Sequence, residues 1–176
     1  IPGPNKDLDK REIKLLNDYL RKNGKLLILL NPDPSESWKQ LLSEWRIDVP
    51  AGTLIDPASH VVPNLDHPLV PRNQNRFGFT EVYFAGAAGL IPQKGLPESF
   101  KIQLLAWTSR KSWIEKDFTS GEEPQFDKLK DQQGPFAIGA MINKGGTSIV
   151  VFGDSDFVTD KHFYNGNNSD LFLTNV

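Results

Sequence analysis

A short, uninterrupted apolar segment near the end of the chain constrains its fold more than any other feature. Residues 149–152 read Ile-Val-Val-Phe, and Gly153 follows them directly. Such a run is typical of a strand that is buried on both faces, as in the middle of a mainly parallel sheet. Three polar residues, Asp154, Ser155 and Asp156, come next. Because ligands of open α/β sheets bind at the carboxyl ends of the strands, we expect this turn to lie at a binding edge.

Helical and strand-like patterns alternate through the first part of the chain. Asp9 and Glu12 form a capping pair ahead of apolar residues at helical spacing, and Ser35 precedes a second segment of that kind. Between these two predicted helices, residues 25–30 form another buried apolar run. Helix, buried strand and helix in close succession favour an α/β layer fold with short connections.

Two further signals describe the expected sheet and its connections. Asn143-Lys-Gly-Gly146 separates two strand-like runs and predicts a hairpin, so the sheet must be mixed. Prolines at positions 50, 57, 63, 68 and 71 interrupt the segment 49–79. Their density predicts one or two short strands and long surface loops in that segment.

Length and composition limit the function classes. A chain of 176 residues has room for one domain with a proper core, so we expect residues 1–176 to form a single domain. The net charge of -2 gives no electrostatic reason to expect nucleic acid or an anionic membrane surface as a partner. The lack of cysteine excludes disulfides, thiolate metal sites and cysteine nucleophiles. Because the chain starts with Ile1 rather than methionine, we expect it to be a piece of a longer protein.

The acidic turn after the apolar run matches parts of several catalytic motifs, none of them complete. Phe152-Gly-Asp-Ser155 matches the first block of Gly-Asp-Ser-type esterases, but the Asp-x-x-His that supplies their base is missing. Asp154-Ser-Asp-Phe-Val158 matches the nucleophile loop of haloacid-dehalogenase-type phosphatases, but too little chain follows to hold their magnesium. An amidotransferase-like hydrolase would need a cysteine nucleophile.

A metal site or a nucleotide site is a weaker alternative. Asp154, Asp156, Asp160 and His162 offer carboxylates and an imidazole, but aspartate-rich turns are more often turn formers than metal ligands. The glycine-rich segment 86–89 has neither the Gly-x-Gly-x-x-Gly nor the Walker pattern of phosphate-binding loops. We therefore expect no metal and no cofactor.

Several segments, taken in order, resemble one known family. The motifs that carry the resemblance are Gly3-Pro4, residues 12–20, Tyr19-Leu-Arg-Lys-Asn-Gly-Lys-Leu-Leu-Ile-Leu-Leu-Asn-Pro32, His67-Pro68, Leu105-Ala-Trp-Thr-Ser109 with Ser112-Trp113, Gly134-Pro135, Val151-Phe-Gly-Asp-Ser-Asp-Phe157 and Gly166-Asn-Asn-Ser-Asp-Leu-Phe-Leu-Thr-Asn175. Together they resemble the extracytoplasmic domain of the auxiliary component of uncharacterised ABC-type transport systems, the GldG-like gliding-motility family.

The resemblance implies a fold, a location and partners. The fold would be a three-layer α/β/α sandwich with a mainly parallel, mixed sheet, similar to flavodoxin-like domains and class I glutamine amidotransferases. The domain would lie on the periplasmic side of the bacterial inner membrane, to which flanking transmembrane helices would anchor the parent protein. An ABC permease and its ATPase would be the partners. The family implies no catalytic residue.

We therefore predict a non-enzymatic domain that binds a ligand, such as a small molecule or a glycan, or that braces the transporter. Its expected site consists of polar side chains at the strand ends: Asn31, Asp33, Thr108, Ser109, Ser112, Asp154, Ser155 and Asp156. Hydroxyls, amides and carboxylates can hydrogen-bond a polyol, but they can also satisfy helix termini and turn amides. The alternative function is an esterase- or amidotransferase-like hydrolase that uses the Asp154-Ser155-Asp156 turn.

Overall fold

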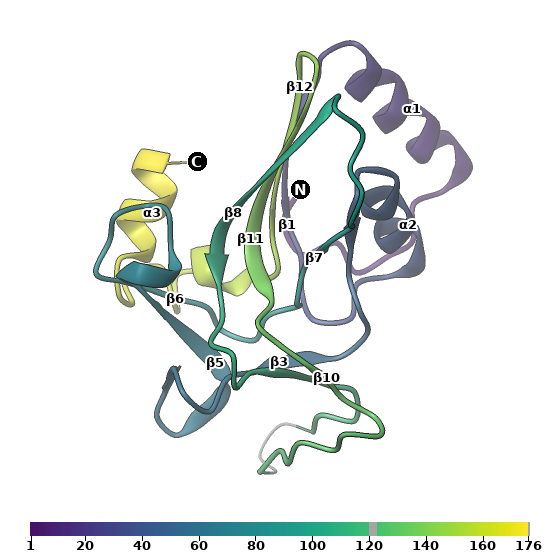
Figure 1. Ribbon diagram of the computed structural model, residues 1–176. Coiled ribbons are helices and arrows are strands. Elements are labelled where there is room, and N and C mark those ends of the chain that lie inside the picture. Colours follow the sequence, from purple (N-terminus) through teal and green to yellow (C-terminus); the bar gives the residue numbers. More distant parts are fainter. Residues whose placement is uncertain (120–122, 176) are drawn as a thin grey trace.

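The largest element of the computed structural model, which describes residues 1–119 and 123–175, is a four-stranded mixed sheet (Figure 1). In spatial order its strands are β1 (Lys25–Leu29), β12 (Thr147–Phe152), β11 (Ala137–Lys144) and β8 (Phe100–Trp107). β1 and β12 run parallel, whereas β11 runs antiparallel to both of its neighbours. The interior position predicted for the apolar run 149–152 is confirmed, because β12 lies between β1 and β11.

The two faces of this sheet bury different residues. On one face, α1 (Lys10–Arg21) and α2 (Glu36–Glu44) contribute Leu20 and Trp38 to a core that includes Ile149 and Val151 of β12. On the other face, Phe152 packs among the rings of Phe77, Phe84 and Phe157. The alternation of β12 side chains between two cores explains why its sequence is apolar at every position from 149 to 152.

The remaining strands form smaller sheets. They make three small sheets, which consist of β3 (Thr53–Ile55) with β9 (Trp113–Glu115) and β10 (Gln132–Gln133), of β4 (His60–Val61) with β5 (Asn64–Pro71) and β6 (Glu81–Tyr83), and of β2 (Ile47–Asp48) with β7 (Ile91–Pro92). The remaining elements are two 3-10 turns, η1 (Arg72–Gln74) and η2 (Asp156–Val158), and the helix α3 (Asn168–Asn175).

The prediction of a three-layer, flavodoxin-like α/β/α sandwich is wrong. Most elements are strands in several small sheets, and α1 and α2 pack on the same core. The other face is covered mainly by residues of the small sheets and of η2, together with Leu171 of α3. The sheet is also not mainly parallel, since β1 and β12 are the one parallel pair of strands among the described residues, next to an isolated parallel bridge between Pro2 and Leu29. The reason lies in the proline-rich segment, which forms β3, β4 and β5 instead of a crossover helix.

The hairpin and the first helix cap are confirmed. β11 and β12 flank the turn at residues 145–146, with Lys144 opposite Thr147. The Asp9 carboxylate accepts the Glu12 amide at 2.8 Å, and the Glu12 carboxylate accepts the Asp9 amide at 2.9 Å. At Ser35 the second helix begins as predicted, although the Ser35 side chain makes no capping hydrogen bond to it. Within the described part of the chain, no helix has the length and apolarity needed to cross a bilayer.

Asp9→Ala should lower the free energy of unfolding by about 1 kcal/mol, because it leaves the first-turn amides of α1 without their acceptor. Urea denaturation of the variant and of the wild type measures this difference. Lys14→Ala, at an exposed position of the same helix, is the control and should change stability by less than about 0.5 kcal/mol. Equal effects of the two substitutions would show that the capping box does not stabilise the helix.

Candidate functional site

The acidic turn lies at the carboxyl end of β12, as predicted, but its first carboxylate is turned inward. Asp154 is fully buried, and its two oxygens accept the amides of Ala85 and Asp156, both at 2.6 Å. Burial raises the pKa of the Asp154 carboxyl to about 7, because its desolvation outweighs the hydrogen bonds from these amides and from that of Phe157. Asp154 therefore joins the loop after β6 to the end of β12.

The structure brings one more predicted residue, Asn31, to this turn and leaves Asp33 apart from it. The Ser155 hydroxyl donates to the side-chain oxygen of Asn31, which follows β1, at 2.5 Å. Asp33 instead pairs with Lys39 of α2 at 2.8 Å and is exposed. Asp156, the last residue of the turn, is exposed to solvent. The ends of β1 and β12 thus lie side by side as expected, but Asp33 pairs with a lysine of α2 instead of joining them.

The predicted hydroxyls after β8 form a second, separate network. The hydroxyls of Thr108 and Ser112 are 2.7 Å apart, and both residues are buried. Ser109 binds Asp56 twice, through its amide at 2.8 Å and its hydroxyl at 2.6 Å. Asp56 is itself buried, and the sequence pattern did not identify it. In both networks the polar atoms bond to one another and to turn amides, a structural role that the sequence also allows.

The catalytic alternatives find no support in this geometry. Ser155 donates its hydrogen bond to an amide oxygen, which cannot take up a proton as a histidine or carboxylate base would. Among residues 1–119 and 123–175, no three histidines, aspartates or glutamates are grouped as a metal site requires. Nothing in the arrangement around the turn therefore activates the Ser155 hydroxyl.

Other titratable side chains lie close to Asp154. The Tyr83 hydroxyl is 2.9 Å from the Nδ1 atom of His67, and the His162 ring lies 5.3 Å from the Tyr83 ring. Burial, with the negative charge of Asp154 as a smaller cause, raises the pKa of Tyr83. Burial also lowers the pKa of His162, and the positive charges of Lys161 and His67 act in the same direction. Asp154, Tyr83 and His162 therefore lie close together near the end of β12.

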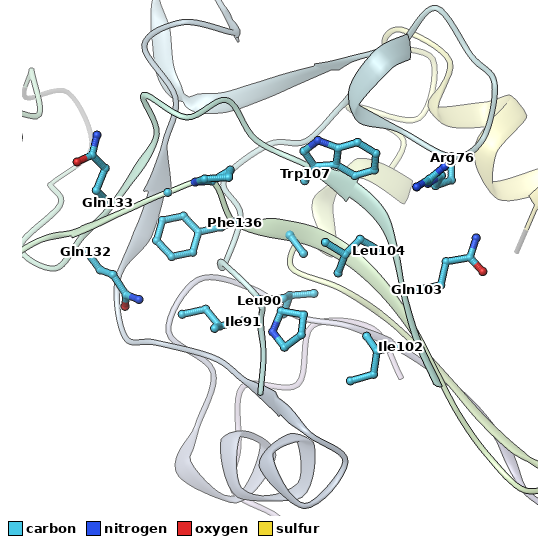
Figure 2. Close-up of a pocket in the computed structure, with 14 residues that line it drawn as sticks. Arg76, Leu90, Ile91, Ile102, Gln103, Leu104, Trp107, Gln132, Gln133 and Phe136 are labelled. Atoms are coloured by element: carbon cyan, nitrogen blue, oxygen red, sulfur yellow. The ribbon is translucent and has the colours of Figure 1, made fainter. Parts of the chain in front are cut away.

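A concave feature lies elsewhere, beside β8. A groove of about 540 Å³ runs past β7, β8 and β10 (Figure 2). It is lined by Arg76, Leu90, Ile91, Pro92, Ile102, Gln103, Leu104, Trp107, Gln132, Gln133, Gly134, Pro135, Phe136 and Ala137. Figure 2 shows apolar side chains in the middle of the groove, with Arg76 and Gln103 at one end and the glutamines of β10 at the other. None of the eight predicted site residues lines it.

Hydrogen bonds and a ring contact hold two parts of the groove lining in place. Arg76 donates its amide to the Leu105 carbonyl at 2.8 Å, and its guanidinium lies 5.6 Å from the centre of the Trp107 ring. On the opposite wall, the Phe136 amide donates to the Thr108 hydroxyl at 2.9 Å. The Thr108 hydroxyl, which we expected to bind a ligand, instead holds the backbone of Phe136, a residue that lines the groove.

Sequence reasoning missed the groove because its residues are spread from position 76 to position 137. The one local signal was Trp107, an aromatic residue at the end of a strand and directly before a polar turn. Arg76 is the only charged residue in the lining, and no described carboxylate lies within 4 Å of its guanidinium. The groove is therefore apolar in the middle, rich in amides and weakly positive.

Comparison with known proteins supports the fold alone. No protein-family model matches the chain, and a search of curated proteins found no match. Among solved structures, the chain is similar to one described as the mmIFT52 N-terminal domain, with a TM-score of 0.66 and 18% sequence identity. The likeness covers 98% of this chain and 73% of that one. The strand-rich arrangement over the whole chain is therefore one that a known domain also adopts.

Proposed function

We propose that this chain is a non-enzymatic binding domain and that the groove beside β8 is its ligand site. The observation that carries the proposal is the groove itself, whose volume of about 540 Å³ lies in the range of ligand sites in proteins. Apolar and aromatic walls with a few polar groups at the ends are typical of such sites. The polar clusters at the strand ends, in contrast, have their hydrogen bonds satisfied within the chain.

The lining favours an elongated ligand with an apolar face and a hydrogen-bonding edge, such as a glycan or a peptide. Trp107, which is half-buried, offers aromatic surface to the apolar face. The side-chain amides of Gln103, Gln132 and Gln133 both donate and accept hydrogen bonds, as hydroxyl and peptide groups require. A glycan was also expected from the sequence, whereas a peptide was not, and the proposed site moves from the strand-end turn to the groove.

A thermal-shift screen of oligosaccharides and short peptides tests the proposal, followed by titration of each ligand that raises the Tm. Gln103→Ala and Gln132→Ala, both at exposed positions, should each raise the Kd about tenfold without changing the Tm of the free protein. The matched controls are Asp33→Ala and Asp156→Ala, at exposed positions of the sequence-predicted site. If the control variants lose affinity and the glutamine variants keep it, the ligand binds at the strand-end turn and the groove assignment is wrong.

We also propose a setting for the domain, which rests on the motif resemblance. In that setting the domain lies on the periplasmic side of the inner membrane, anchored through its parent chain, and works with an ABC permease and ATPase. Purification of the full-length protein from its own membrane tests this. Recovery of a permease and an ATPase in fixed ratio supports the setting, and recovery of the protein in the soluble fraction without them contradicts it.

A further inference from the structure

We infer that the ligand is an extended, acidic peptide segment that adds to the free edge of β8 as a further strand. This inference rests on the proposed binding function of the groove and names its partner class. It requires an open strand edge, side-chain contacts beside that edge and a charge that selects acidic sequences. Each of these features is present.

β8 has an unpaired edge over most of its length. It is the terminal strand of the four-stranded sheet, with β11 on one side (Figure 1). On its other side, the chain bonds to it only near its end, where Asn75 bridges Ala106 and the Arg76 amide reaches the Leu105 carbonyl. Within the described part of the chain, no strand pairs with that side of residues 100–104. Backbone groups on such an edge are available to a strand from another chain.

The groove lies directly beside this edge. Ile102, Gln103 and Leu104 belong to β8 and also line the groove. Lys101 and Gln103 are exposed, and Ile102 and Leu104 are half-buried, so the middle of the strand is accessible. Because side chains alternate along a strand, a peptide paired with β8 would direct every second side chain to the groove side. Backbone pairing would then supply affinity, and the groove would supply selectivity.

Positive charge lies near both ends of β8 and on the strand itself. Arg76 lies at one end and Lys101 lies on the strand itself. At the other end, Lys144 and Arg46 are 4.6 and 5.7 Å from the centre of the Phe100 ring. The ion pairs of the described residues involve Lys39, His67 and Lys130, so none of these four cations is neutralised by a carboxylate within 4 Å. Unpaired cations repel basic strands and attract acidic ones, which selects an acidic peptide.

The first test uses peptides of random sequence. A phage-displayed library of dodecapeptides is selected against the chain, and the strongest binder is synthesised in three forms. One form is unmodified, and the other two carry N-methyl groups on alternate residues, at odd or at even positions. Strand addition uses every second amide of the peptide, so one N-methylated form should bind about tenfold more weakly than the other. Equal affinity of the two N-methylated forms would overturn strand addition.

The second test measures the charge preference with the same unmodified peptide. Lys101→Glu and Arg76→Glu should each raise its Kd about tenfold at low salt, and the effect should shrink as the ionic strength rises. Lys14→Glu, on the exposed side of α1, is the control and should leave the Kd unchanged. An unchanged Kd in both edge variants, or a selection that yields no acidic sequences, would overturn the acidic partner.

The two proposals fail in different ways. If oligosaccharides bind and Gln103→Ala and Gln132→Ala weaken them, while the library yields no acidic binder, the groove stands as the ligand site and the peptide inference is wrong. If acidic peptides bind but neither glutamine variant nor either edge variant changes their Kd, the peptides bind elsewhere and the peptide inference is wrong. The groove assignment is wrong as well only if the two glutamine variants also keep full affinity for every oligosaccharide that binds.

Discussion

Gly153→Ala should lower the free energy of unfolding by about 3 kcal/mol, because a methyl group at this position has no space. A β-carbon there would lie 2.1 Å from the carbonyl oxygen of Ala88, which belongs to the backbone and cannot rotate away. Hydrogen bonds hold Gly153 against two other segments. The Ala88 amide donates to the Gly153 carbonyl at 2.7 Å, and the Gly153 amide donates to the Ile138 carbonyl at 2.8 Å. Urea denaturation of the wild type and the variant measures the loss.

Gly78→Ala is the matched control for this substitution. An added β-carbon at Gly78 meets no heavy atom within 4 Å, so the control changes only the backbone preference at a φ of +81°. Its expected cost is about 1 kcal/mol. If Gly153→Ala costs no more than Gly78→Ala, the segment around Ala88 can move away from the end of β12. The contact between Gly153 and Ala88 would then not be needed to position the Ala85 amide beside Asp154.

The segment around Gly153 was also the part of the fold that local sequence predicted best. An apolar residue at every position of a short run requires burial on both faces, and β12 is buried between two cores. A glycine followed by polar residues requires a turn, and the turn is present. These features depend on neighbours along the chain, so a single sequence was enough to place them.

The fold class could not be predicted because it depends on pairing between distant segments. Residues 49–99 contain short apolar pieces whose partners lie far away, as when β3 pairs with β9. The prolines of β5 also mislead, because a proline can still accept a hydrogen bond in a sheet. Pro68 pairs with His60 of β4, and its carbonyl accepts the Phe84 amide at 3.0 Å. The density of prolines therefore indicated long loops in a region where β4, β5 and β6 form an antiparallel sheet.

The candidate site was missed for a related reason. Acidic and hydroxyl residues after strands indicate ligand contacts and buried structural hydrogen bonds equally well, and only tertiary structure separates the two. Asp56 illustrates this, because a single aspartate between prolines is typical of a surface turn, yet it is buried and anchors Ser109. The groove, in contrast, is made by residues that are unremarkable singly and become a site only when β8, β7 and β10 come together.

Asp154 should make the protein less stable as the pH rises from 4 to 8, which is the opposite of the usual effect of a carboxylate. Its folded-state pKa of about 7 lies above the ordinary value of 3.8, so the folded protein binds the proton more tightly than the unfolded chain does. The resulting stability is fully present below pH 3.8 and is lost as the pH rises through 7. A shift of this size corresponds to about 4 kcal/mol.

A comparison with Asp154→Asn isolates this contribution from those of other titratable groups. The asparagine does not ionise, so the free energy of unfolding of the wild type minus that of the variant should fall by about 4 kcal/mol between pH 4 and pH 8. Ser155→Ala, an uncharged change at the next residue, is the control, and its difference from the wild type should stay constant with pH. A constant difference for Asp154→Asn as well would mean that the amides of Ala85, Asp156 and Phe157 stabilise the charge fully. The buried carboxylate would then be a permanent anion that binds the end of β12 to the loop after β6, and its carboxyl carbon would show no NMR titration near pH 7.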